Sequence, residues 1–314
     1  MKRRNFIRTV STGLAASVSG CNYIFEEQDE KIIVPTTRLD SGSITVFEDG
    51  GDLTAVGDQP LLPPTIQEET LPTQNVKKRI IKSQYYNKDF NDDIFIDRHQ
   101  IRYLKSTHQK LTQIKKYLGF GHFNLVSFDE AIKFSKRYSK IQAFTKQELD
   151  FLDQIFHTNA QAYGFFGDKV IPDMTSVISK RDTKKIPYTG HFLYRGEALA
   201  LYSKIRREIG QGIILTSGIR GVIKQMHLFL TKTIVVGGNL SRASRSLAPP
   251  GHSYHGIGDF DVGKVGFGTK NFTNAFAGTD VYRKLIKSGY IHIRYTKGNP
   301  FGVRYEPWHI KVVT

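Results

Sequence analysis

The stretch Ser253-Tyr254-His255-Gly256-Ile257-Gly258-Asp259-Phe260-Asp261, read with Glu306-Pro307-Trp308-His309, organises this chain. Two histidines and one aspartate are a ligand set for a catalytic zinc ion, which needs three protein ligands and an open position for water. Residues an odd number apart face opposite sides of a regular strand, so Glu306 and His309 cannot share one face of such a strand. A turn at Pro307 would bring them together, because proline fixes φ and has no N–H group. We therefore expect Glu306 to be the base beside the metal.

These motifs resemble those of the D-alanyl-D-alanine carboxypeptidase family of zinc peptidases, which share the fold of the lysostaphin and hedgehog-type metal proteins. The family patterns are S-x-H-x-x-G-x-A-x-D and E-x-W-H. The matching residues, in chain order, are Ser253, His255, Gly258, Glu306, Trp308 and His309. Upstream, Ser217-Gly218-Ile219-Arg220 is similar to the family's S-G-Y-R turn. The resemblance covers the last third of the chain, from about residue 213.

One departure from the family pattern leaves the metal-binding aspartate open. The family places its aspartate seven residues after the first histidine, whereas Asp261 follows His255 by six. A deletion of one residue explains this spacing, but it leaves Asp259 as a rival ligand. His252 is a second alternative, because His252 and Asp259 are seven residues apart. His252 lacks the glycine three positions later, so the pattern favours His255.

The resemblance implies a role for each of these residues. His255, Asp261 and His309 would bind Zn²⁺, and the ion would lower the pKa of a bound water. Glu306 would accept the proton of that water and deliver it to the leaving amine. Arg220 would stabilise the developing oxyanion or hold the terminal carboxylate of the substrate, and these two roles stay open. Ser253 and Gln225 complete the predicted substrate-binding set.

The first 21 residues are typical of an export signal and are excluded from the fold. Arg3-Arg4-Asn5-Phe6-Ile7-Arg8 resembles the twin-arginine signal, and Val18-Ser19-Gly20-Cys21 resembles a bacterial lipobox. Cys21, the single cysteine of the chain, would be the lipidation site. These features predict a protein that is attached to a membrane by lipid and faces the periplasm. Asn22, in place of a retention-type aspartate, favours the outer membrane by resemblance to diderm lipoproteins.

Composition divides the remaining chain into three parts. Residues 22–92 contain Pro60, Pro63, Pro64 and Pro72 without a sustained apolar period, which predicts an extended linker. A helical region is expected over 93–164, with capping boxes at Ser127–Glu130 and Thr145–Glu148. We place the catalytic domain at 165–314.

The predicted fold class is α+β. Strands are expected at 213–216, at 260–262, at 289–295 and, as one final strand, over 303–308 and 310–313. They would form an antiparallel sheet with helices on one side around the zinc site, preceded by the helical region and the flexible tether.

The predicted function is that of a zinc carboxypeptidase that removes the terminal D-alanine of peptidoglycan stem peptides. An endopeptidase with D,D- or L,D-specificity and a wall-binding lipoprotein without turnover are the alternatives. The formal net charge is +16. Nucleic acid is nevertheless not favoured as a partner, because the chain has no basic–aromatic motif of the known binding modules and an exported lipoprotein would not meet it. The sequence does not indicate an oligomeric state.

Overall fold

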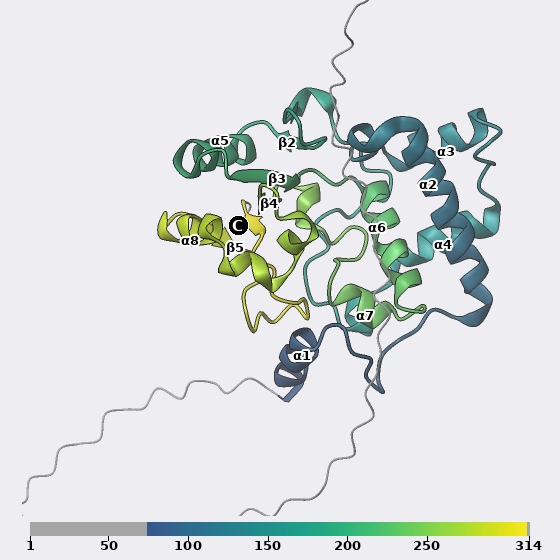
Figure 1. Cartoon of the computed structure of the whole chain (residues 1–314). Helices are drawn as coiled ribbons and strands as arrows, with labels where there is room; N and C mark the ends of the chain where they lie inside the picture. Colours follow the sequence, from purple (N-terminus) through teal and green to yellow (C-terminus); the bar gives the residue numbers. More distant parts are fainter. Residues whose placement is uncertain (1–73, 313–314) are drawn as a thin grey trace, which may run out of the picture. The chain divides into compact units, whose positions relative to one another are not determined.

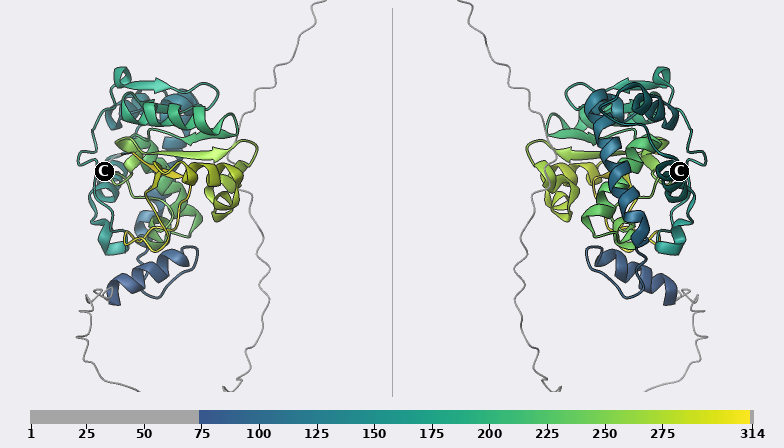
Figure 2. Two further views of the ribbon diagram at one scale, coloured as in Figure 1. Left: turned by 90° about the vertical axis from the view of Figure 1, so that its left-hand side faces the viewer. Right: turned by 90° about the vertical axis from the view of Figure 1, so that its right-hand side faces the viewer.

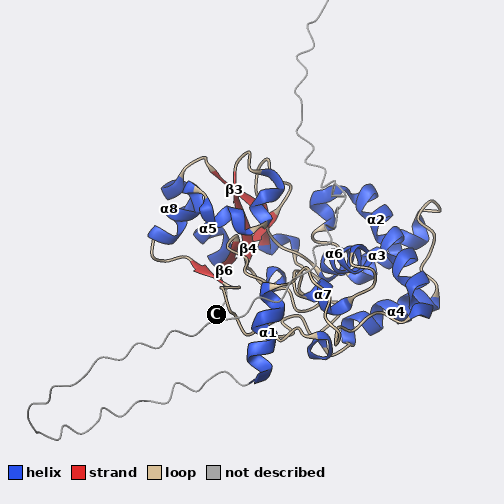
Figure 3. Cartoon of the chain, turned by 60° about the horizontal axis from the view of Figure 1, so that its bottom comes forward, coloured by secondary structure: helices blue, strands red, loops and turns tan. Residues whose placement is uncertain are grey.

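A computed structural model describes residues 74–312 of the 314-residue chain. The predicted signal, the lipidation site Cys21 and residues 22–73 of the predicted linker lie outside the described residues. Within the described part the chain mixes helices with a C-terminal antiparallel sheet, as the sequence predicts (Figures 1 and 3). None of the described helices has the length and apolar character that a membrane-spanning segment requires.

The end of the predicted linker, residues 74–92, forms helix and turn rather than extended chain. It begins with α1 (Gln74–Gln84), and the segment after α1 is held by the buried carboxylate of Asp93. Asp93 accepts hydrogen bonds from Arg245 Nη1 at 2.8 Å and from Asn239 Nδ2 at 2.8 Å. The sequence does not show this anchor, because Arg245 and Asn239 lie about 150 residues further along the chain.

The predicted helical region contains η1 (Arg98–Gln100), α2 (Ile101–Phe123), α3 (Phe128–Arg137), α4 (Lys146–His157) and η2 (Ala160–Tyr163). Both predicted capping boxes are present, with Ser127 and Thr145 as N-caps. Gly119 has φ +75° inside α2, a conformation that glycine adopts without steric cost. The backbone at Gly119 is therefore not helical: α2 is kinked there, and helical turns resume after it up to Phe123.

Two sheets follow. A short one pairs β1 (Thr183–Lys185) with β2 (Phe192–Tyr194), after η3 (Lys180–Asp182). The main sheet is antiparallel in the order β3-β4-β6-β5. Its strands are β3 (Ile213–Ser217), β4 (Phe260–Lys264), β5 (His292–Ile293) and β6 (His309–Lys311).

The last strands are shorter than expected. Within 289–295, β5 comprises His292–Ile293, and residues 303–308 form no strand. Arg304 N donates to Arg245 O and Glu306 N donates to Tyr295 O, so the backbone before β6 forms no continuous ladder. A turn at Pro307–Trp308 then precedes the three residues of β6.

The remaining helices are α5 (Glu197–Ile209), α6 (Val222–Val235), α7 (Leu240–Ser244) and α8 (Asp280–Lys287), with η4 (Tyr254–Gly256), η5 (Gly268–Phe272) and η6 (Asn274–Gly278). α5 and α8 contact each other beside the main sheet (Figures 1 and 2). Both lie away from the group of helices around α6 (Figure 1). Phe260, Val262 and Ile310 pack with residues of α5 and α8 in one hydrophobic core. Because side chains alternate along a strand, Asp261 and His309 face the other side of this sheet.

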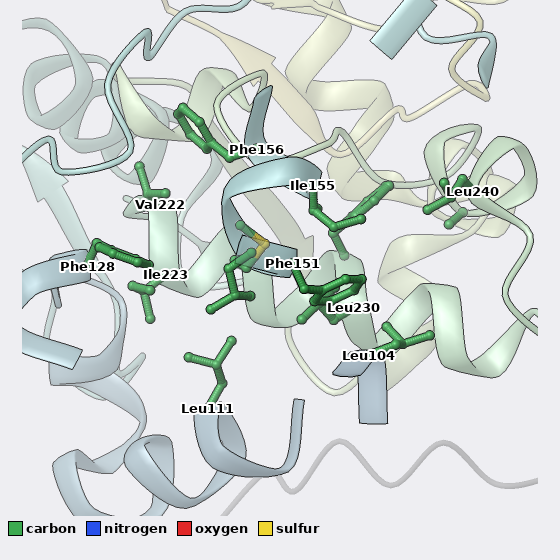
Figure 4. Close-up of a cluster of buried hydrophobic side chains, with 14 of the residues drawn as sticks. Leu104, Leu111, Phe128, Phe151, Ile155, Phe156, Val222, Ile223, Leu230 and Leu240 are labelled. Carbon is green, nitrogen blue, oxygen red and sulfur yellow. The ribbon is translucent and has the colours of Figure 1, made fainter. Parts of the chain in front are cut away.

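A second hydrophobic core joins the helical region to the C-terminal part. α2, α3, α4 and α7 place apolar side chains around Val222, Ile223 and Leu230 of α6 (Figure 4). The described residues accordingly all lie within one compact unit. The predicted boundary at residue 165 stays a prediction, since this core contains residues from both sides of it.

Candidate metal centre and active site

Strand register brings the predicted ligands together. Asp261 of β4 lies directly opposite His309 of β6, and it also pairs with Ser217 at the irregular end of β3. Directly opposed residues of antiparallel strands place their side chains on the same face, close to each other. His255, in η4, is added from the loop that leads into β4. The main sheet therefore assembles the candidate centre from segments about 50 residues apart.

The three side chains form a group whose ligand atoms all lie within 4.8 Å of one another. His255 Nε2 is 3.2 Å and His309 Nδ1 is 3.4 Å from Asp261 Oδ1. Two ligand atoms at zinc–nitrogen or zinc–oxygen distance from one tetrahedral ion lie about 3.3 Å apart, so this spacing suits a zinc ion. His255 Nε2 and Asp261 Oδ1 are buried and make no hydrogen bond within residues 74–312. Buried polar atoms normally have partners, and a cation would supply one here.

Hydrogen bonds on the far side of each ring orient the two imidazoles. His255 Nδ1 lies 2.8 Å from Gly218 O, and His309 Nε2 lies 3.0 Å from Asp259 Oδ2. Such contacts fix the ring tautomer, so that the other nitrogen points at a metal. Burial, together with the positive charge of Arg220, lowers the pKa of His255 to about 4 and keeps its imidazole neutral. Neutral imidazole is the form that binds zinc.

Asp259 lies behind His309 and is not part of the candidate ligand group. Its carboxylate also accepts from Val312 N at 2.8 Å and from the guanidinium of Arg294. Burial alone would raise the pKa of Asp259, but the contacts to His309 and Arg294 outweigh it and lower the pKa to about 2. Of the two aspartates left open by the sequence, the geometry places Asp261 in the group and Asp259 behind His309.

Arg294, which the sequence did not single out, connects this support to Tyr254 and, through Tyr254, to Asp168 in the segment after η2. Its guanidinium lies 3.5 Å from the centre of the Tyr254 ring, and Tyr254 OH donates to Asp168 at 2.7 Å. Arg294 and these partners come from three separate parts of the chain. The sequence shows only that Arg294 is a charged residue next to an expected strand, and this does not indicate that it pairs with Asp259.

Glu306 reaches the same centre by the predicted turn. His309 N donates to Glu306 O at 3.1 Å across Pro307 and Trp308. Glu306 Oε2 consequently lies 3.7 Å from His309 Nδ1. Burial raises the pKa of the Glu306 carboxyl above its ordinary value.

Arg220 contacts the ligand group directly. Its Nη2 donates to Asp261 Oδ2 at 2.6 Å, and its Nε donates to Ser217 Oγ at 2.8 Å. Burial alone would raise the pKa of Asp261, but the interaction with His255 and the positive charge of Arg220 outweigh it and hold the pKa well below the ordinary range. Arg220 thus orients the carboxylate oxygen that faces away from the two imidazoles.

The two remaining residues of the predicted substrate-binding set, Ser253 and Gln225, are buried. Ser253 lies next to η4. The amide of Gln225, on α6, donates to Ala248 O, while its Oε1 makes no hydrogen bond within the described residues. His252 lies 3.2 Å from Gly167 O through Nδ1 and packs on Phe165, outside the ligand group.

Comparisons with known proteins agree with the motif resemblance. Residues 196–314 match the model of a family described as VanY, D-alanyl-D-alanine carboxypeptidase. The resemblance that the motifs predicted is confirmed for this part of the chain. A comparison with curated proteins gives no match.

Three solved structures are similar to parts of the chain. VanYB in complex with D-alanine-D-alanine is 22% identical, with a TM-score of 0.37, over 48% of this chain and 86% of that one. A variant of the D,D-pentapeptidase VanY in complex with Zn(II) is 22% identical, with a TM-score of 0.36, over 46% and 86%. The LdcB LD-carboxypeptidase is 25% identical, with a TM-score of 0.34, over 41% of this chain. The chain spans 62% of the length of LdcB.

Proposed function

We propose that this chain, whose residues 196–314 match the D-alanyl-D-alanine carboxypeptidase family, is a zinc-dependent carboxypeptidase that removes the terminal D-alanine of peptidoglycan stem peptides. One observation carries the proposal: three buried ligand atoms have the spacing of a zinc site, and a carboxylate lies 3.7 Å from one of them. A binding module without turnover has no use for a base beside its metal, so the position of Glu306 favours an enzyme.

His255, Asp261 and His309 would hold the metal. A bound zinc ion supplies Lewis acidity towards a carbonyl oxygen and makes water a better nucleophile. The chain's own contribution is to fix the two imidazoles from behind, through Gly218 O and Asp259, and to keep Asp261 ionised beside Arg220. Orientation of this kind keeps the ligand atoms in place during turnover.

Glu306 performs the proton transfers in this proposal. It accepts a proton from the attacking water and returns that proton to the amide nitrogen of the departing D-alanine. Arg220, beside Asp261, stabilises the oxyanion that develops on the scissile carbonyl. Removal of one D-alanine therefore needs a base, a cation at the oxyanion and a metal within one small volume, and Glu306, Arg220 and the candidate ligands around Asp261 would provide them.

The proposed location is the periplasmic side of a bacterial membrane, with attachment through a lipid on Cys21. The amino-terminal motifs and the 52 residues from position 22 to 73, which precede α1, support this, because a long linker gives a membrane-attached enzyme reach towards the wall. Their support comes from the sequence, as Cys21 lies outside the described residues.

A digest of purified muropeptides tests the function. The wild-type protein is incubated with pentapeptide monomers and with cross-linked dimers, with and without a zinc chelator, and the products are separated by mass. We expect loss of one alanine from the pentapeptide, abolished by the chelator and restored by added zinc. Glu306→Gln should lower the rate on the order of 100- to 10,000-fold. Glu197→Gln, an exposed glutamate at the start of α5, is the matched control and should leave the rate unchanged.

Two results would contradict the proposal. Cleavage that survives Glu306→Gln at the wild-type rate would defeat the assigned mechanism. Cleavage of cross-linked dimers without any loss of terminal alanine would identify an endopeptidase instead.

A further inference from the structure

A second arginine lies beside the proposed base. Arg304 precedes Glu306 by two residues, in the segment that leads to β6. Its Nε is 3.6 Å from Glu306 Oε1, whereas the other carboxylate oxygen of Glu306 faces His309. The side chain of Arg304 is 18% exposed, so it is largely enclosed but remains accessible to a small ligand.

Two aromatic rings hold this guanidinium in position. The central carbon of the Arg304 guanidinium lies 4.8 Å from the ring centre of Tyr86 and 5.0 Å from that of Trp308. Arg304 N also donates to Arg245 O at 2.8 Å, which fixes the backbone. Contacts with aromatic faces restrict the orientation of an arginine without using its N–H donors. Tyr86 lies outside residues 196–314, so the chain outside the matched part contributes to this arrangement.

The Nε atom of Arg304 also lacks a hydrogen-bond acceptor within the described residues. This atom is buried, and its nearest carboxylate, on Glu306, is beyond hydrogen-bond distance. Arg220 differs, because its Nη2 and Nε already donate to Asp261 and Ser217. Arg294, the third arginine at the centre, is paired with Asp259. Arg304 is therefore the arginine whose Nε has no hydrogen-bond acceptor within residues 74–312.

We propose that Arg304 is a substrate-binding residue that holds the terminal carboxylate of the departing amino acid; this inference rests on the proposed carboxypeptidase function. The carboxyl carbon of a C-terminal residue is two bonds, about 2.5 Å, from the amide nitrogen of the scissile bond. Glu306 must approach that nitrogen to return a proton, so the carboxylate comes to lie near Glu306. A guanidinium next to Glu306 balances this second negative charge and binds it with planar, paired donors.

The consequence is selectivity for a free chain end. A stem peptide that ends in D-alanine offers a carboxylate to Arg304, whereas a cross-linked or amidated end does not. A site built around a charged partner discriminates against a ligand without it, because the partner then stays buried and unpaired. The geometry thus favours removal of a terminal residue over cleavage within a cross-link.

Paired substrates test this inference. kcat and KM are measured on a pentapeptide with a free terminal carboxylate and on the same peptide amidated at that end, for the wild type and Arg304→Met. The wild type should prefer the free acid on the order of 10- to 100-fold in kcat/KM. In Arg304→Met, kcat/KM on the free acid should fall by that factor, mainly through a higher KM, whereas kcat/KM on the amide should change little. Arg304→Lys, which keeps the charge without the planar donors, should lie between them.

Further variants separate a binding role from a merely structural one. Lys297→Met removes a nearby exposed cation, which lies over the ring of Tyr305, and should leave the preference unchanged. Tyr86→Leu removes one of the two rings and should weaken the preference partly. Equilibrium binding of the acid and the amide to Glu306→Gln protein gives a readout that does not depend on turnover, with the same order expected.

Three results would overturn the inference. Arg304→Met could lose activity equally on acid and amide, it could retain the full wild-type preference, or the wild type could treat both peptides alike. An inactive wild type is a different failure, since it would contradict the proposed function itself.

Discussion

Two buried polar clusters differ in how they are completed. In the helical region, Lys110 Nζ donates to Glu148 Oε2 at 2.5 Å and to Ala143 O at 2.9 Å. Glu148 also accepts from Thr145 N, as part of the capping box of α4. On the polar face of the sheet, His255 Nε2 and Asp261 Oδ1 have no hydrogen-bond partner among residues 74–312. The first cluster is satisfied by the chain itself, whereas the second has the donor set of a site that an ion completes.

Removal of the charged ligand should give the largest effect. We expect Asp261→Asn to weaken zinc binding on the order of a thousandfold, because one of three ligands and the only negative charge of the set are lost. Competition with a chromophoric chelator measures the dissociation constant. Asp280→Asn, at an exposed ion pair with Lys264, is the control and should bind zinc as the wild type does. Equal zinc affinity of both variants would remove the metal site from this face of the sheet.

The ion pair of the helical region should respond in stability and not in metal binding. Lys110→Met leaves Glu148 buried and unpaired, which should cost about 3–5 kcal/mol of the free energy of unfolding. Lys146→Met breaks the exposed pair with Asp150 on α4 and should cost less than about 1 kcal/mol. Denaturant unfolding of both variants checks this difference. A similar cost for the two would mean that burial of the Lys110–Glu148 pair does not matter.

Asp259 tests the distinction between ligand and support. Asp259→Asn removes the carboxylate behind His309, and zinc affinity should fall about 10- to 100-fold, less than for Asp261→Asn. The same chelator competition measures it. If Asp259→Asn lost more zinc affinity than Asp261→Asn, Asp259 would be the metal ligand and Asp261 the supporting residue.

Two stacked histidines, His108 on α2 and His227 on α6, should make the stability depend on pH. Burial, together with the charges of Lys115, His108 and Lys224, lowers the pKa of His227 from 6.5 to about 2. Below pH 6.5 the unfolded chain therefore binds a proton at His227 that the folded chain does not bind. The free energy of unfolding consequently decreases as the pH falls below 6.5. The slope for this group is about 1.4 kcal/mol per pH unit. His108, stacked on His227 at 5.1 Å, has a pKa lowered by the same cause and adds to it.

His227→Phe should reduce this slope while keeping a ring between His108 and Phe123. Denaturant unfolding between about pH 7 and pH 4.5 provides the comparison. His157→Phe, at an exposed position on α4, is the control. An unchanged slope in His227→Phe would show that another group causes the acid sensitivity.

The sequence predicts the parts of the site that depend on short motifs. The spacing around His255 and His309 and the proline after Glu306 are visible in consecutive residues. A turn at Pro307 and two capping boxes need only local geometry, and the structure has them. These features follow from contacts within a few residues of each other.

Other parts depend on partners far apart in the sequence. The choice between Asp259 and Asp261 needs the pairing of β4 with β6, and the Arg294–Asp259 contact joins residues 35 positions apart. The sequence did not predict α1 or the role of Arg304 for the same reason. Asp93, which anchors the segment after α1, binds Arg245, and Tyr86, which contacts Arg304, also lies more than 140 positions from its partner. The last strands are shorter than expected because tertiary contacts take up their backbone N–H groups.

The register of β4 and β6 has a consequence for when the protein can act. Both Glu306 and His309 arrive with β6, which follows every other described strand in chain order. A partly synthesised or partly folded chain has neither the base nor the second imidazole in place. Under the proposed function, hydrolysis would therefore begin only once β6 pairs with β4, and a chain that has not reached this pairing would be inactive.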